Sequence, residues 1–446
     1  MPSKVCSNIN KNKLATLFFV FSLPLFITAC TLTETLSGLP LIGKFFDGGG
    51  NGPVRTGPAD LTVWTLWEHP DVLNVLAQRF SEQNSSVTIN FDDRSVIKPI
   101  VDYKERAYLR AEDPAGPDIM RVHVSWLPTL VSSLVPMPEK MMDAQTFSNS
   151  FYPSATKSLV YDGKIYGLPS YYDGLVLVYN KDHFEEVGQL EAPTAWEEFR
   201  RLALELTIRS ENEEIIRGGA AMGTADNIDF FSDIVGMLFE QAQVPLPGEL
   251  DGQAAQDALS FYVNFVEEDG VWSSNLPEAS AAFAQEKVSM IFIPTWNLLD
   301  IIAARPDMNI GVAPVPQALP DEPASWASYW VDVVPKSSDA PEASWAFLHF
   351  LAQEEQQLLA YSEASKFRRF GAPYSLVSLK PELDSNPYVN PLLESAPYGK
   401  TNSFANRAGN RKQVESLRSA IGSLTSGDNY SSVEDILRAM KTELEN

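Results

Sequence analysis

Aromatic residues beside polar side chains are the groups in this chain whose types and spacing could do chemistry. Tyr171, Tyr172 and Asp173 stand directly before the apolar run 175–179, and similar groups stand beside other apolar runs. The further members of this set are Trp64, Trp67, Glu68, Arg121, His123, Trp126, Trp296, Asn297, Trp326, Tyr329 and Trp330. Flat rings stack on the apolar C–H faces of a sugar, and carboxylates and amides bond its hydroxyl groups. The set therefore predicts a binding site for a neutral, hydroxylated ligand.

Each member of this set also has a purely structural interpretation. A single tryptophan at the end of a strand could equally fill the core. Arg121 could form an internal ion pair, and His123 could be a hydrogen-bonded structural residue. The prediction depends on rings that recur at four strand ends.

Strand and helix patterns alternate along the chain, and these elements must position the rings. Helices are expected to begin near Pro70, Thr194, Pro341 and Ser431. Strands are expected at 61–66, 87–91, 118–124, 175–179, 288–293, 309–313 and 329–334. Such alternation predicts an α/β fold with mainly parallel sheets. In open α/β sheets, ligands bind beyond the carboxyl ends of the strands, where most of the rings fall.

The first 29 residues have the pattern of an export signal. Lys4, Lys11 and Lys13 precede the apolar run 14–26, which the letters ITAC close at Cys30. A basic start, a short apolar core and a small-residue cleavage site are typical of secretory signals. The segment resembles a bacterial lipoprotein signal, which implies cleavage before Cys30 and lipid on the thiol and amine of that residue. An ordinary signal with an incidental cysteine is the alternative.

Charge, length and cysteine content narrow the class of protein. The chain carries 34 Lys and Arg against 58 Asp and Glu, a net charge of −24, which argues against nucleic acid as a partner. Removal of the signal takes Cys6 away and leaves Cys30 alone, so no internal disulfide is expected. A chain of 446 residues exceeds what one core supports and predicts two lobes. Residues 30–58 are rich in glycine and proline and predict a flexible tether. We also expect a monomer without a cofactor or a bound metal.

Several stretches of residues 60–365 carry a family resemblance. They are LTVWTLWEH, GPDIMRVHVSWLPTL, YDGKIYGLPSYYDGLVLVYNKDHF, APTAWEEFRRLA, AFAQEKVSMIFIPTW and VVPKSSDAPEASWAFLHFL. In this order they resemble the extracellular solute-binding proteins of ABC importers, a group that includes maltose-binding and maltodextrin-binding proteins.

This resemblance implies a two-lobed periplasmic-binding-protein-like fold with the ligand cleft at the hinge. The N-terminal lobe would comprise residues 59–168 and 323–365, and the C-terminal lobe residues 169–322 and 366–446. The segment after GLP would cross between the lobes, so that Tyr171, Tyr172 and Asp173 line the cleft.

Ligand contacts follow from the same resemblance. Trp296 matches the tryptophan that stacks on a bound sugar. The region of Trp64, Trp67 and Glu68 and the segment from Arg121 to Trp126 match contact regions of the other lobe. Ser125 stands where the maltose-binding pattern has an acidic residue, which argues against a maltodextrin ligand.

The expected function is capture of a carbohydrate outside the cell and its delivery to an ABC permease, without enzymatic activity. Lipid on Cys30 would hold the protein on the outer face of the cell membrane. A secreted glycoside hydrolase is one alternative, because spacing alone does not exclude a carboxylate pair. Receptors for ferric iron, bound by paired tyrosinates, or for a polyol, peptide or phosphorylated ligand are others.

Overall fold

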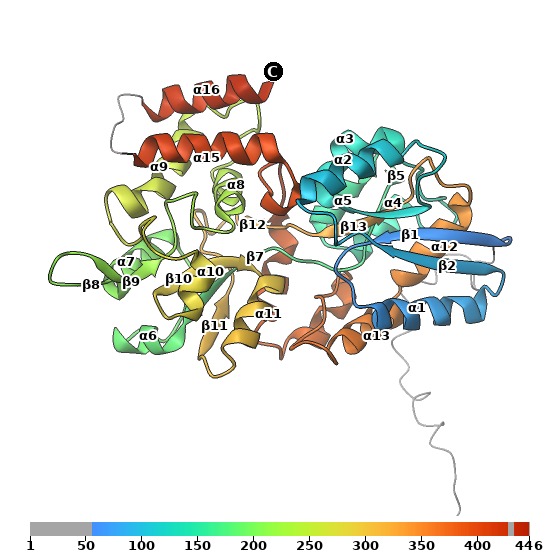
Figure 1. The fold of residues 1–446 in the computed structure, drawn as a ribbon, viewed down its shortest axis with the longest axis horizontal. Helices are drawn as coiled ribbons and strands as arrows, with labels where there is room; N and C mark the ends of the chain where they lie inside the picture. The colour runs from blue at the N-terminus through green and yellow to red at the C-terminus, as the bar shows by residue number, and fades with distance from the viewer. Residues whose placement is uncertain (1–55, 427–431, 446) are drawn as a thin grey trace, which may run out of the picture. The chain divides into compact units, whose positions relative to one another are not determined.

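The computed structural model describes residues 56–426 and 432–445, which contain two five-stranded sheets with flanking helices (Figure 1). The predicted signal, Cys30 and the tether as far as residue 55 lie outside the described residues. We call the part built on each sheet a lobe.

The first lobe is built on a sheet with the strand order β2-β1-β3-β13-β6. These strands are β1 Ala59–Thr65, β2 Val87–Asp93, β3 Ile119–His123, β6 Leu168–Pro169 and β13 Trp330–Val333. The longer helices around it are α1 Pro70–Gln83, α2 Ile100–Arg110, α12 Pro341–Leu351 and α13 Glu354–Ala364. Val72, Leu76 and Phe80 are the buried residues of α1, which packs against α12 and α13.

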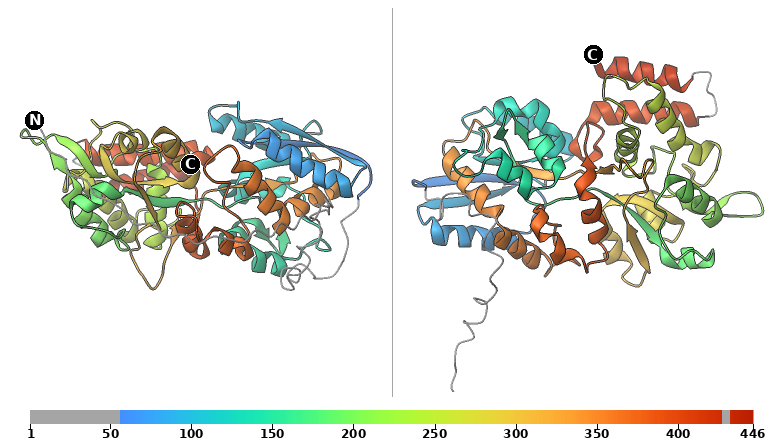
Figure 2. Two further views of the ribbon diagram at one scale, coloured as in Figure 1. Left: turned by 90° about the horizontal axis from the view of Figure 1, so that it is seen from below. Right: turned by 180° about the vertical axis from the view of Figure 1, so that it is seen from behind.

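The second lobe is built on a sheet with the strand order β11-β7-β10-β9-β8. These strands are β7 Leu175–Asn180, β8 Ile208–Arg209, β9 Ile215–Ala220, β10 Val288–Pro294 and β11 Ile310–Ala313. Its helices are α6 Lys181–Glu186, α7 Trp196–Leu206, α8 Phe231–Gln241, α9 Gln253–Glu267, α10 Ala279–Ala284, α11 Thr295–Ala304, α14 Asn390–Ser395, α15 Arg411–Thr425 and α16 Val433–Glu445. The last two helices lie together against α9, as two views show (Figures 1 and 2). Every residue of β7 is buried, as its continuous apolar run predicts.

Short elements complete the described part of the chain. The remaining α-helices and strands are α3 Leu127–Leu130, α4 Ala144–Ser150, α5 Pro153–Leu159, β4 Val160–Tyr161, β5 Lys164–Ile165, β12 Ser325–Trp326 and β14 Gly399–Lys400. The 3₁₀ helices are η1 Val124–Trp126, η2 Val131–Ser133, η3 Val377–Leu383, η4 Ala396–Tyr398 and η5 Asn406–Ala408.

Both sheets are mixed, whereas the sequence pattern predicted mainly parallel ones. In the first lobe β1 runs parallel to β2 and β3, but β13 is antiparallel to β3 and β6. In the second lobe β7 is antiparallel to both β10 and β11. The cause is the crossing of the chain between lobes. A strand that arrives from the other lobe starts at the edge where its neighbours end, and it must therefore run against them.

The predicted elements occur near their expected bounds, and one helix begins two residues later than expected. α1 and α12 begin at Pro70 and Pro341, as expected. The helix expected near Thr194 begins at Trp196 and has no side-chain cap. Glu198 accepts a hydrogen bond from the Thr194 backbone N–H at 3.2 Å, just before this helix.

The crossings between the lobes lie side by side. The backbone of Gly174, in the crossing 170–174, bridges to Ala327 in the crossing that precedes β13. A Cβ atom on Gly174 would lie 1.9 Å from the carbonyl oxygen of Trp326, so only glycine allows this approach. The backbone N–H of Tyr172 donates to Pro373 in a third crossing at 2.9 Å. Three segments of the chain therefore join the two lobes.

Candidate ligand-binding cleft

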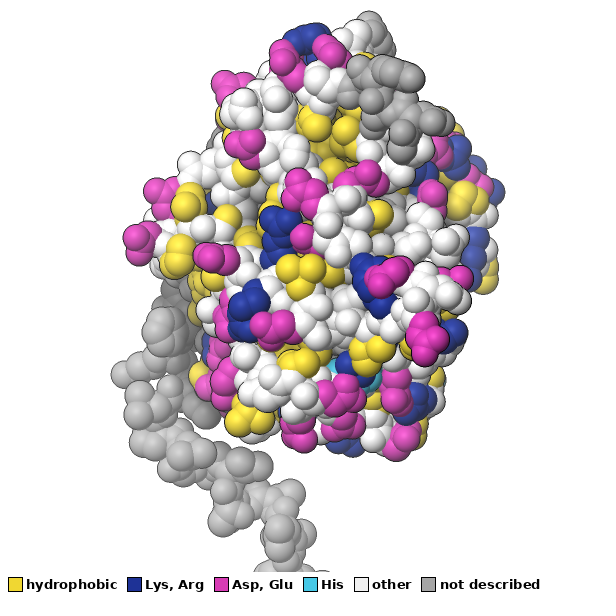
Figure 3. All heavy atoms as spheres, turned by 90° about the vertical axis from the view of Figure 1, so that its left-hand side faces the viewer, with side chains coloured by type: hydrophobic (Ala, Val, Ile, Leu, Met, Phe, Trp, Pro, Cys, Tyr) yellow, Lys and Arg dark blue, Asp and Glu magenta, His cyan; other side chains and the backbone are white. Residues whose placement is uncertain are grey.

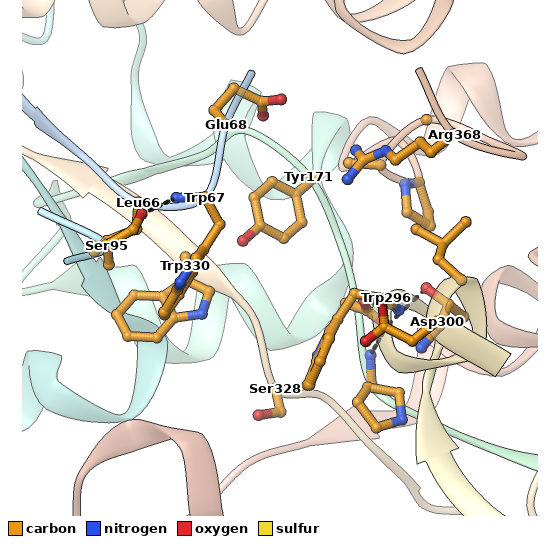
Figure 4. A pocket seen from close by; sticks show the side chains of 18 of the residues that line it. Leu66, Trp67, Glu68, Ser95, Tyr171, Trp296, Asp300, Ser328, Trp330 and Arg368 are labelled. Carbon is orange, nitrogen blue, oxygen red and sulfur yellow. Dashed lines mark hydrogen bonds between the residues drawn. The ribbon is translucent and has the colours of Figure 1, made fainter. Parts of the chain in front are cut away.

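A cavity of about 1250 Å³ opens where the crossings meet the carboxyl ends of the central strands (Figure 4). Both lobes and all three crossings contribute to its wall. The lining side chains on which the argument below depends are Trp67, Glu68, Lys98, Arg121, Tyr171, Asp173, Phe230, Asp233, Trp296, Asp300, Trp326, Ser328, Trp330 and Arg368. The volume exceeds that of a typical small-molecule pocket and has room for more than one sugar ring.

Trp67 presents an exposed ring at the cavity. It follows β1, its side chain is 43% exposed, and its backbone has a φ of +54°. A bulky residue in the left-handed region costs about 1 kcal/mol or more, so its surroundings must hold it there. Its backbone N–H donates to Ser95 Oγ at 2.6 Å, and its ring contacts the edge of Trp330 at 5.1 Å between centroids.

Trp296 is the second aromatic face, and it comes from the other lobe. It lies in the first turn of α11 and is partly buried, with Phe230 edge-on at 5.7 Å. The carboxylate of Asp173 accepts hydrogen bonds from the backbone N–H groups of Thr295 at 3.0 Å and Trp296 at 3.3 Å. In Figure 4 the Trp296 ring and the pair Trp67–Trp330 lie on different sides of the cavity, with Tyr171 between them.

Arg121 lines the cavity and belongs to a buried ion pair. Arg121 donates to Asp332 through two parallel bonds, Nε–Oδ1 at 2.9 Å and Nη2–Oδ2 at 3.0 Å. Ser170 Oγ donates to the same carboxylate at 2.5 Å, and the guanidinium of Arg121 lies 5.9 Å from the centre of the Tyr171 ring. Burial raises the pKa of Tyr171, and the cationic Arg121 opposes that rise in part. The phenol of Tyr171 is therefore protonated at neutral pH and offers an O–H group.

The structure brings eight of the fourteen predicted ligand contacts to the cavity. They are Trp67, Glu68, Arg121, Tyr171, Asp173, Trp296, Trp326 and Trp330. Trp326 is nonetheless fully buried and donates its indole N–H to Asp233 at 2.7 Å. Its ring is part of the solid wall and does not offer a free face.

Six predicted contacts lie outside the cavity lining, and their placement corrects the expectation from sequence. They are Trp64, His123, Trp126, Tyr172, Asn297 and Tyr329. Tyr172 packs between Tyr152 and Tyr329 at 5.0 and 5.3 Å, because successive side chains of an extended segment point to opposite sides and Tyr171 takes the cavity side. Asn297 accepts a hydrogen bond from Ser280 Oγ at 3.0 Å.

The other corrected residues support the wall from behind. Trp126 is fully buried, donates to the carbonyl of Ala408 at 2.5 Å and contacts Trp330 edge-on at 5.5 Å. Trp64 is buried and contacts Tyr103 at 6.2 Å between ring centroids. Their rings affect the cavity only through the neighbouring residues against which they pack.

His123 and Ser125 form a buried hydrogen-bonded group. Nδ1 of His123 lies 2.9 Å from Ser125 Oγ, and Nε2 lies 3.1 Å from Ser328 Oγ. Burial lowers the pKa of His123 to about 3, so its ring is neutral at neutral pH. Ser125 thus bonds to a neighbour inside the lobe and does not line the cavity.

Sequence reasoning missed one wall of the cavity entirely. Residues 366–371 all line it, in the loop that follows α13. The letters KFRRF in this loop hold three cations within four residues of an acidic chain, a composition signal that could have marked it. Lys98 and Asp300 were also missed, because neither stands beside the rings in the sequence.

The described residues contain no group of three or more His, Cys, Asp or Glu side chains that could hold a metal ion. The two adjacent tyrosines point to opposite sides of their segment, so they cannot chelate ferric iron together as paired phenolates. Within the described ranges, no helix has the length and apolar character needed to span a membrane. On the face that Figure 3 shows, acidic and basic side chains are interspersed.

The fold and the interlobe cavity define a class of two-lobed binding proteins. A family model described as "Bacterial extracellular solute-binding protein" matches residues 67–358, well over half of the chain. The chain therefore belongs to this family. It is a solute-binding protein and not an enzyme, and proteins of this family act outside the cytoplasm together with ABC permeases.

Three relatives illustrate the similarity. The mannitol-binding protein of Pseudomonas aeruginosa is 23% identical over 278 residues, which are 59% of this chain and 60% of that protein. An ABC transporter solute-binding protein of Thermotoga lettingae, solved with alpha-D-tagatose, has a TM-score of 0.63 at 21% identity over 86% of this chain and 100% of its own. A cyclo/maltodextrin-binding protein complexed with maltotetraose has a TM-score of 0.70 at 18% identity over 87% and 97%. These similarities confirm the two-lobed periplasmic-binding-protein fold.

Proposed function

We propose that this chain is a lipid-anchored receptor that captures a carbohydrate in the cleft and delivers it to the permease of an ABC importer. The lobes that close on the ligand are residues 59–168 with 323–365 and residues 169–322 with 366–446. Ligand contacts that exist only in the closed form shift the equilibrium between open and closed states. The permease then recognises the closed form, and the receptor acts as a monomer.

One observation supports this proposal most directly. Trp67 and Trp296, one from each lobe, border the same cavity, and hydroxyl-binding groups such as Glu68, Asp300 and Tyr171 lie between or beside them. A carbohydrate is bound by aromatic rings that stack on its C–H faces and by polar groups that hydrogen-bond its hydroxyls. The sugar-bound proteins of the same fold support the same ligand class, and the mannitol-binding relative extends it to an acyclic polyol.

The membrane anchor belongs to the same proposal. The letters ITAC at residues 27–30 and the basic start before them support cleavage and lipid attachment at Cys30. The glycine-rich residues that follow give the folded part reach above the membrane. The net charge of −24 leaves the lipid as the source of membrane affinity and disfavours nucleic acid as a partner.

A thermal-shift screen tests the ligand class. Monosaccharides, oligosaccharides and mannitol are added to the purified protein, and ligands that raise the melting temperature are measured by calorimetry. A ligand at a hundred times its Kd stabilises the folded protein by about 2.7 kcal/mol, which shifts the melting temperature visibly. Recovery of the oligosaccharide unchanged by chromatography serves as the control for hydrolysis. If no sugar or polyol shifts the melting temperature, the proposal fails.

A further inference from the structure

Basic residues gather at the cavity, although the protein as a whole is acidic. Five basic residues line it against four acidic ones, a local balance of +1, whereas the whole chain carries −24. The basic residues are Lys98, Arg121, Lys366, Arg368 and Arg369, and the acidic ones are Glu68, Asp173, Asp233 and Asp300. A gathering of basic residues in a binding cavity favours an anionic group on the ligand, because the field of the rest of the protein repels anions.

Two of the four carboxylates already accept hydrogen bonds from other groups of the protein. Asp173 accepts hydrogen bonds from the backbone of Thr295 and Trp296 at the start of α11. Asp233 accepts one from the indole of Trp326 at 2.7 Å. Both carboxylates keep their negative charge, but these hydrogen bonds already use part of their capacity to bind a ligand.

The basic residues differ in whether the protein itself supplies them with hydrogen bonds or an ion pair. Arg121 is held by both oxygens of Asp332, and Lys366 pairs with Glu363 at 2.5 Å. Arg368 is different, because no hydrogen bond or ion pair joins it to another described residue. Its Nε is buried without a hydrogen-bond partner. A half-buried guanidinium without an ion-pair partner in contact is costly, so its presence favours a partner that comes from outside.

The position of Arg368 suits contact with a ligand. In Figure 4 its side chain extends from the backbone toward the middle of the cavity, on the side of Tyr171 away from Trp67. It borders both the main cavity and a smaller one of about 60 Å³ behind it. Lys98, exposed on the loop before α2, lines the main cavity as a second cation. The planar fork of an arginine matches the two oxygens of a carboxylate or a phosphate.

We propose that Arg368, assisted by Lys98, binds an anionic group on the hydroxylated ligand, so that the natural ligand is an acidic carbohydrate. This inference depends on the proposed function, because the rings are needed to hold the hydroxylated part. The anionic group is a carboxylate, as in a uronate, or a phosphate ester.

Matched pairs of ligands test this inference. Glucuronate and glucose, a galacturonate disaccharide and the corresponding galactose disaccharide, and glucose 6-phosphate and glucose differ mainly in charge. Calorimetry at low and high salt gives the Kd of each, with inorganic phosphate alone as a probe of adventitious anion binding. We expect at least one acidic compound to bind about tenfold or more tightly than its neutral partner, with a preference that weakens in high salt.

The variant Arg368→Gln assigns the preference to one residue. It should abolish most of the preference for the acidic compound and leave the neutral one within about twofold, because only charge-assisted bonds are lost. Arg106→Gln is the matched control, since it removes the same charge from an exposed arginine of α2 outside the cavity. Lys98→Gln should reduce the preference less than Arg368→Gln.

The outcomes separate this inference from the proposed function. The pair with the largest preference identifies the carboxylate or the phosphate ester as the anionic group. Equal affinity within every pair, a preference that survives in Arg368→Gln, or binding of inorganic phosphate only would overturn the inference. If neutral sugars bind and no acidic partner binds more tightly, only this inference fails. If no compound of the panel binds, the proposed function fails as well.

Discussion

Two tryptophans of the same wall have different tasks, and their exposure separates them. Trp67 is 43% exposed and borders the cavity, whereas Trp126 is fully buried behind Trp330 and bonds to the Ala408 carbonyl. The ring of Trp67 can stack on a ligand, whereas the ring of Trp126 can only support the residues that line the cavity. Removal of the Trp67 ring should therefore change the affinity for the ligand, and a change at Trp126 should alter the melting temperature.

Trp67→Ala should weaken sugar binding with little effect on folding. A central aromatic platform contributes about 2 kcal/mol to binding, which corresponds to roughly thirtyfold in Kd. Calorimetry with the best ligand of the screen measures the loss, and Trp296→Ala should give a loss of similar size. Unchanged affinity in Trp67→Ala would show that this ring is not a platform.

The control for this prediction is Trp126→Phe. The phenylalanine keeps most of the buried apolar surface but loses the indole N–H, so the Ala408 carbonyl loses its donor at a cost of about 1–2 kcal/mol in stability. Its melting temperature should fall while the Kd stays within a few fold of the wild-type value.

At the scale of elements, the start of helix α11 depends on a carboxylate that belongs to a crossing between the lobes. Asp173 accepts bonds from Gly174 N–H at 2.7 Å and from both N–H groups at the first residues of α11. This arrangement fixes Trp296 relative to the crossing. Burial raises the pKa of Asp173 to about 6, although these hydrogen bonds act in the opposite direction.

This pKa predicts a pH dependence of stability. The ordinary value of 3.8 applies to the unfolded chain, so the folded chain binds the proton more tightly. The contribution of Asp173 to stability is therefore fully present below pH 3.8 and is lost as the pH rises through about 6. Relative to Asp173→Asn, the wild-type free energy of unfolding should increase by about 1.4 kcal/mol between pH 7 and pH 5. Urea unfolding of both proteins at the two pH values measures this difference, and a constant difference would contradict it.

The helices and strands were more predictable from sequence than the direction in which each side chain points. The apolar run 175–179 and the starts at Pro70 and Pro341 are local signals, and the structure has elements at these places. The choice between Tyr171 and Tyr172 depends on the packing of Tyr152 and Tyr329, which come from distant parts of the chain. Strand direction was mispredicted for a similar reason, since it follows from the order in which the chain crosses between the lobes.

The wall formed by residues 366–371 shows the same limit. Its charge pattern is visible in the sequence, but its approach to the cavity depends on how α13 packs against α1. No local spacing connects this loop to the rings of Trp67 or Trp296. Only the folded chain makes it part of the site.

For the whole molecule, the close contact of the crossings controls how the two lobes are joined. Gly174→Ala places a Cβ atom 1.9 Å from the carbonyl oxygen of Trp326, so the two segments must separate. We expect a loss of about 2–3 kcal/mol in the free energy of unfolding and weaker ligand binding, because the hinge itself is displaced.

Gly422→Ala is the matched control for this substitution. It lies within α15, and a Cβ atom there would have no neighbour within 4 Å. Because alanine is the better helix former, this variant should gain about 0.5–1 kcal/mol. Chemical unfolding of the two variants gives the comparison, and equal stability of Gly174→Ala and the wild type would show that the crossings tolerate separation.

The exchange of strands between lobes also sets the order in which the chain can fold. β3 ends at His123, but its neighbour β13 arrives only with Trp330–Val333, after the whole central part of the second sheet. During synthesis the first sheet thus stays incomplete until most of the chain has emerged, and such distant pairings form slowly. A chain whose two sheets depend on one another in this way acquires its binding site only when nearly all of its residues are available to fold.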